Sequence, residues 1–150
     1  MIAQFIICFF ATLSFAVLFS APKRQLVFCG LTGAIGWIVY LIVIEIDGGI
    51  ALANICASFT LTVMARIFAA LERHPVTVYL LAGIFPLVPG AGIYYTSYYF
   101  IMHEMDNFAK YGSETLIVAG SIVFGIVFGF SIPQSLFNAL PHVGAKKTKK

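Results

Sequence analysis

Apolar residues occur along this chain in long blocks, separated by short groups of charged and turn-forming residues. Because about 20 consecutive apolar residues cross a bilayer as a helix, each block predicts one membrane span. The blocks cover residues 2–21, 25–44, 50–70, 76–101 and 115–138. We therefore expect an all-α integral membrane protein, built as a single transmembrane domain of about five helices with a basic tail at 139–150.

The fourth block is interrupted near its middle by two prolines and three glycines, in the segment from Gly83 to Gly92. Pro86 and Pro89 lack the N–H groups that would bond the carbonyls of Ala82 and Phe85. Backbone groups freed in this way are tolerated in hydrocarbon only inside protein or beside a water-filled cavity. The sequence thus predicts a broken fourth span beside a path or binding site, with an ordinary proline kink as the alternative.

Composition supports the membrane class. The chain is 61% hydrophobic and only 10% charged, with a mean hydropathy of +0.98, which is far more apolar than an average soluble domain. The spans leave little sequence for a soluble domain. The net charge of +3 comes mostly from basic residues at particular loops and at the end of the chain, so it argues against nucleic acid as a partner.

Basic residues orient the spans. They follow spans one, three and five, whereas Lys110 alone falls on the opposite side. The positive-inside rule therefore predicts an amino terminus outside and a carboxyl terminus in the cytoplasm. In this orientation Trp37 and Tyr40 fall toward the outer end of span two, and the tyrosines of span four fall in its outer half, as expected for an interfacial belt.

Residue patterns typical of enzymes are missing from the sequence. Neither a His-Glu-x-x-His pair nor a Cys-x-x-Cys pair occurs, and the three cysteines lie in three different spans. The nearest approach to a metal cluster is His103-Glu104 with Asp106, which we interpret as a solvated loop. We expect no catalytic residue, no metal site and no cofactor, and hence no enzyme.

Two spans carry patterned polar or small residues. Ser121, Gly125 and Gly129 recur every four residues on span five, a spacing that lets helix backbones approach closely, and Pro133 is expected to kink the end of that span.

On span three, Asn54, Ser58, Thr62 and Arg66 form a polar stripe on one face. The stripe has two interpretations. It binds neighbouring helices, with Arg66 reaching the cytoplasmic interface, or its outer residues Asn54 and Ser58 line a substrate path.

The direction of span four determines which charged groups the break would favour. A second half-helix starting at about Gly90 to Gly92 would point its positive amino terminus toward the midplane, where it favours a carboxylate. The carbonyls of Ala82 and Phe85 could accept hydrogen bonds from an ammonium group. Such a break would recognise a zwitterionic amino acid without a charged side chain. Tyr94, next to the break, is either an interfacial residue or part of the lining.

The segment GIFPLVPGAGIY, from Gly83 to Tyr94, resembles the threonine/serine exporter family. More closely, the chain is similar to the small subunit that corresponds to the carboxy-terminal membrane half of that family. The resemblance implies a secondary exporter of threonine, serine or related small carboxylates in the bacterial inner membrane. It also implies a longer membrane subunit that supplies the other half, and it assigns Pro86, Pro89, Gly90 and Gly92 to the transport-site region.

Together these arguments define the expected site and partners. An odd number of spans fits two bundles in opposite orientations, as in inverted-repeat transporters. Since no carboxylate lies centrally in any span, we expect a coupling carboxylate, if one exists, in the partner subunit. The lipid bilayer, the substrate and a possible second copy of the chain are the other partners. The alternatives are a homomeric small-solute pore and an accessory subunit without its own path. The candidate substrate-binding residues are Ala82, Phe85, Pro86, Pro89, Gly90, Gly92, Tyr94, Asn54 and Ser58.

Overall fold

The computed structural model describes residues 1–134, which form helices joined by short turns and contain no strand. This confirms the predicted all-α class. The elements are α1 (Ile2–Leu18), η1 (Lys23–Gln25), α2 (Leu26–Glu45), α3 (Gly49–Glu72), α4 (Val76–Ile84), η2 (Phe85–Leu87), α5 (Gly90–Ile101) and α6 (Met105–Ser131). The predicted basic tail at 139–150 lies outside the described residues.

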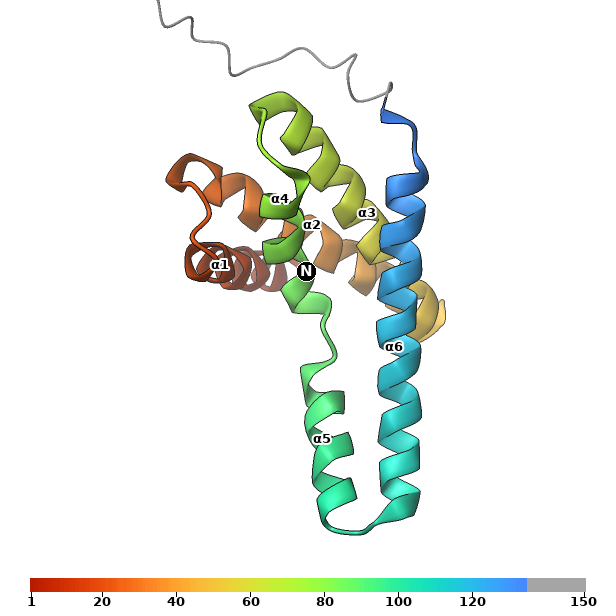
Figure 1. Ribbon diagram of the computed structural model, residues 1–150. Helices are drawn as coiled ribbons and strands as arrows, with labels where there is room; N and C mark the ends of the chain where they lie inside the picture. The colour runs from red at the N-terminus through yellow and green to blue at the C-terminus, as the bar shows by residue number, and fades with distance from the viewer. Residues whose placement is uncertain (135–150) are drawn as a thin grey trace, which may run out of the picture.

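Figure 1 shows two parts of different shape. The helices α1 to α4 gather at one end, where α1 and α2 lie across the direction of α6. The carboxy-terminal half of α6 packs beside α3, whereas its amino-terminal half pairs with α5 in a hairpin that extends away from the other helices (Figure 1). The break between α4 and α5 therefore lies where the hairpin leaves the bundle.

Within residues 1–134, three helical segments are long and apolar enough to cross a membrane: 23–45, 49–72 and 105–131. The pair formed by 76–87 and 90–101 adds a fourth if it counts as one bent span. Helix α1 is apolar but has 17 residues, fewer than the roughly 20 of an upright span. The count of five spans remains a prediction.

The last helix differs from the predicted span of 115–138. It begins ten residues earlier, at Met105, because Asp106, Lys110 and Glu114 lie on its first turns, where a hydropathy pattern does not find them. It ends at Ser131, and Ile132 is extended with φ −66° and ψ 129°, as a residue before proline prefers. Pro133 therefore follows the end of α6, and residues 135–138 of the predicted span lie outside the described residues.

Small residues bring α6 against α3. A Cβ atom at Gly125 would overlap the hydroxyl of Ser58, and one at Gly129 would lie 2.6 Å from Cβ of Thr62. Ser121 is 6% exposed and its hydroxyl donates to the carbonyl of Ile117 on its own helix. Close backbone approach thus fixes the position of the polar stripe of α3 relative to α6.

Arg66, at the end of that stripe, binds the end of α6. It is 4% exposed, and Nη1 donates to the carbonyl oxygens of Gly129 and Ile132, each at 2.7 Å. Nη2 donates to Oε1 of Gln134 at 2.8 Å. A helix leaves its last carbonyls unbonded and carries partial negative charge there, so the guanidinium satisfies both needs.

We expect the Arg66→Met substitution to lower the free energy of unfolding by about 2–4 kcal/mol, because it leaves buried carbonyls without a donor. Arg24→Met is the matched control, since Arg24 is exposed. Unfolding of the purified variants in mixed detergent micelles measures the difference. Equal stability of the two variants would contradict the assigned role of Arg66.

Candidate functional site

The fourth span is interrupted in the structure by a non-helical segment. Helix α4 ends at Ile84, the 3-10 turn η2 follows, Val88 is extended with ψ 128°, and α5 begins at Gly90. The two helical parts meet at an angle of 57°. The backbone N–H of Val88 donates to the carbonyl of Phe85 at 3.2 Å, so this carbonyl is not free as the sequence had suggested.

The amino terminus of α5 retains unbonded donors. The N–H of Gly90 donates to Val88 O at 2.8 Å, and the N–H of Ile93 donates to Pro89 O at 3.0 Å. Within residues 1–134, the N–H groups of Ala91 and Gly92 have no acceptor outside their own helix. These two donors, together with the helix dipole, favour negative charge beside Pro89.

Close packing on α2 and α3 holds α4, the first half of the broken span. A Cβ atom at Gly83 would lie 3.1 Å from Cγ2 of Thr32 and 3.3 Å from Cδ1 of Leu61. The next residue toward the amino terminus, Ala82, is 1% exposed. This end of α4 therefore cannot shift sideways without displacing core side chains.

A cavity of about 200 Å³, here called the site cavity, lies between the break and the neighbouring helices. The break contributes Pro86, Leu87 and Pro89, while α3 contributes Ile50 and Asn54. The remaining lining residues are Trp37 and Tyr40 of α2 and Val118 of α6. Its volume is below the roughly 300–1,000 Å³ of pockets for drug-sized ligands.

Asn54 supplies polarity to the site cavity. Its side chain is 2% exposed, and Nδ2 donates to the carbonyl of Ile50 at 2.8 Å. In the described part of the chain Oδ1 receives no hydrogen bond, so at the cavity it can accept one from a ligand that carries a donor. The lining residues of the site cavity include no charged side chain.

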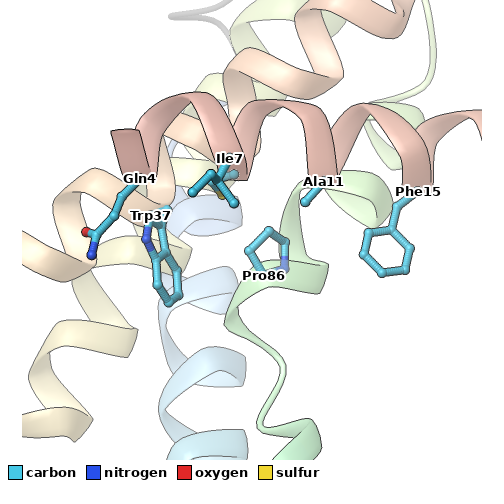
Figure 2. Close-up of a pocket in the computed structure, with 7 residues that line it drawn as sticks. Gln4, Ile7, Ala11, Phe15, Trp37 and Pro86 are labelled. Atoms are coloured by element: carbon cyan, nitrogen blue, oxygen red, sulfur yellow. The ribbon is translucent and has the colours of Figure 1, made fainter. Parts of the chain in front are cut away.

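A second cavity of about 260 Å³, here called the apolar cavity, also has Trp37 and Pro86 in its lining. Figure 2 shows Trp37 and Pro86 next to the side chains that α1 directs toward them. The lining residues are Gln4, Ile7, Cys8, Ala11, Phe15, Trp37 and Pro86. Gln4 is the single amide side chain among them.

A comparison with models of known protein families identifies the family of this chain. Residues 4–132 match the family model described as "Threonine/Serine exporter, ThrE". The chain belongs to the threonine/serine exporter family. It is therefore a membrane protein of a transporter family, which is not an enzyme class. No solved structure matches the chain.

Three predicted site residues of this exporter-family chain meet at the site cavity. Pro86 and Pro89 line it from the break, and Asn54 lines it from α3. Gly90 follows directly and is exposed, with open space where a Cβ atom would be. The break and the Asn54 end of the polar stripe thus face each other.

The other predicted residues lie elsewhere. Ala82 is in the core, and Phe85 stacks on Phe15 with ring centroids 4.4 Å apart. Gly92 packs against Thr115 of α6, and Tyr94 is 62% exposed.

Ser58 is also away from the cavity. It is fully buried and faces Gly125, and its hydroxyl donates to the carbonyl of Asn54 at 2.7 Å. The polar stripe is therefore divided: Asn54 reaches the site cavity, while Ser58 contributes to helix packing.

Trp37 and Tyr40 line the site cavity, and their predicted position near the membrane interface stays a prediction. Their rings stack at 5.1 Å with an interplanar angle of 22°. Hydropathy does not separate an interfacial aromatic residue from one beside an internal cavity. The nearby Gly33 and Gly36, which pack closely against α1 and α3, are the sequence signal for an inward-facing helix.

We expect cysteines at positions 54 and 89 of the exporter to react with a small thiol reagent. Each is introduced singly into a variant whose three native cysteines have been replaced. Both positions border the site cavity, whereas the control Ser58→Cys is fully buried. Mass spectrometry of the labelled protein in membranes measures the reaction rates. Position 58 reacting as fast as position 54 would contradict the geometry of the site.

Proposed function

We propose that this chain is one half of a secondary exporter that moves small amino acids such as threonine and serine, or related small carboxylates, outward across the bacterial inner membrane. The proposal combines the family of the chain with the chemistry of the site cavity. In the proposed orientation the amino terminus is outside and the carboxyl terminus is in the cytoplasm, as the distribution of basic residues favours.

The observation that carries this proposal is that the broken span and Asn54 line the same small cavity. Discontinuous helices in transporters place backbone donors and acceptors at the substrate site, where a continuous helix would use them internally. Here Pro86 and Pro89 have no N–H to donate, and Ala91 and Gly92 retain donors just beyond the cavity lining. The segment therefore combines a cavity with unbonded backbone groups.

The chemistry of this arrangement favours a small solute with no net charge. The amino terminus of α5 favours a carboxylate, and the amide oxygen of Asn54 accepts a hydrogen bond from an ammonium or hydroxyl group. The lining of the cavity has no charged side chain that would bind an additional charge on the solute. A small zwitterionic amino acid satisfies all three conditions.

A longer membrane subunit of the same family is the proposed partner for the other half. Helix α5 has no buried residue, and the unbonded N–H groups at its start need protein or water around them in a bilayer. Large apolar side chains on the outer face of α6 are exposed, namely Leu116, Ile117, Val123, Phe124, Val127 and Phe128. A partner bundle on the hairpin would enclose the break, and lipid would cover the remaining surface. A coupling carboxylate, if the exporter uses one, is assigned to that partner, since none lines the cavity.

Export of threonine from cells loaded with a threonine-containing dipeptide tests the proposal. Cells with both subunits should export threonine, and cells with this chain alone should not. Conductance by the purified chain alone would instead favour a homomeric pore. If export is unaffected when this chain is removed, the chain is an accessory subunit.

Gly90→Leu should lower the export rate at least about tenfold, because the leucine side chain fills space beside the break; tenfold corresponds to about 1.4 kcal/mol. Gly120→Leu is the matched control, since Gly120 also has open space around it but lies on α6 outside the site cavity. Both variants should assemble with the partner. Normal export by Gly90→Leu would show that the break is not part of the transport site.

A further inference from the structure

We propose that Trp37 is a specificity-determining residue of the transport site, because its indole separates the site cavity from the apolar cavity and so excludes solutes with large apolar side chains. This inference rests on the proposed export function. It adds a size limit, set by one side chain of α2, to a site whose polar chemistry comes from the break and from Asn54.

The two cavities share two lining residues, Trp37 and Pro86. Pro86 belongs to the broken backbone, so Trp37 provides the large side chain of the shared wall. Figure 2 shows its indole beside Pro86 and the α1 residues of the apolar cavity. Removing the indole would join a space of about 200 Å³ to one of about 260 Å³.

Two contacts fix the position of the indole, one made by its own ring and one made by the helix that carries it. Tyr40, one turn further along α2, stacks on it at 5.1 Å. The preceding residue, Gly36, lies so close to α3 that a Cβ atom would be 3.3 Å from two atoms of Leu61. Because α2 cannot rotate without displacing this contact, the indole forms a stable wall.

The chemistry on the two sides of this wall differs. Asn54 and the adjacent amino terminus of α5 supply polar groups on the site-cavity side. The lining on the other side is mostly aliphatic and aromatic, with Gln4 as its one amide. An amino acid bound through its polar groups at Asn54 would direct a long apolar side chain at the indole, which blocks it. Once the indole is removed, that side chain gains an apolar space.

The geometric test uses a cysteine at position 54 and two maleimides, one with an ethyl and one with a cyclohexyl group. In the Trp37→Ala background the ratio of cyclohexyl to ethyl labelling should rise at least about tenfold, a typical discrimination for added methylene groups. The control, Ile7→Ala, enlarges the apolar cavity without opening the shared wall and should leave the ratio unchanged. An unchanged ratio in Trp37→Ala, or an equal rise in Ile7→Ala, would overturn the inference.

The transport test compares leucine and threonine export by the complete exporter. The ratio of leucine to threonine export should rise in the order Trp37, Trp37→Phe, Trp37→Leu, Trp37→Ala, and the milder variants keep the test valid if Trp37→Ala does not fold. Threonine export with an unchanged ratio would overturn the role of Trp37 in specificity. Failure of the unsubstituted exporter to move any amino acid would instead reject the proposed function, and the labelling ratio would still decide whether Trp37 separates the cavities.

Discussion

Two missing backbone N–H groups, those of Pro86 and Pro89, determine how this molecule is built around its fourth span. A helix cannot continue through both residues without leaving carbonyls unbonded in an apolar environment. The structure resolves this with a short 3-10 turn, an extended residue and a new helix at an angle of 57°. The interruption places backbone groups at the side of a small cavity, where a straight helix would have used them internally.

Tight contacts through small residues keep that cavity in place. Gly83 lets α4, the first half of the broken span, pack against Thr32 and Leu61, and Gly36 lets α2 pack against the same leucine. On the other side, Gly125 and Gly129 bring α6 onto α3, and Arg66 binds the end of α6. Helix α3 is thus the common support of the break, the wall of α2 and the long helix α6. The cavity therefore lies between closely packed helices, whereas α5, in the hairpin, has no buried residue.

Sequence patterns revealed much of the fold because hydropathy and proline act locally. The helices at 26–45 and 49–72 and the break before Gly90 follow from apolar length and from missing donors. The start of α6 did not follow, since Asp106, Lys110 and Glu114 interrupt the apolar pattern while still adopting helix against α5.

The candidate site was harder to predict than the fold, because it depends on which helix faces meet. Spacing alone placed Asn54 and Ser58 on one stripe, but only tertiary packing puts Asn54 at the cavity and Ser58 beneath Gly125. Likewise, tryptophan is a residue type typical of interfacial anchors. The proposed role of Trp37 as the wall between the two cavities depends on the close approach of α1 and α2. Gly92 belongs to the same motif as Pro89 and nevertheless packs against Thr115.

The most direct measurement is an experimental structure of the chain with its partner subunit and a transported amino acid, solved by electron cryomicroscopy in a lipid nanodisc. The account predicts a broken span at residues 85–89, with ligand density between Asn54 and the break and its carboxylate toward the start of α5. A continuous helix through residues 76–101, or a ligand bound away from Pro86, Pro89 and Asn54, would contradict it.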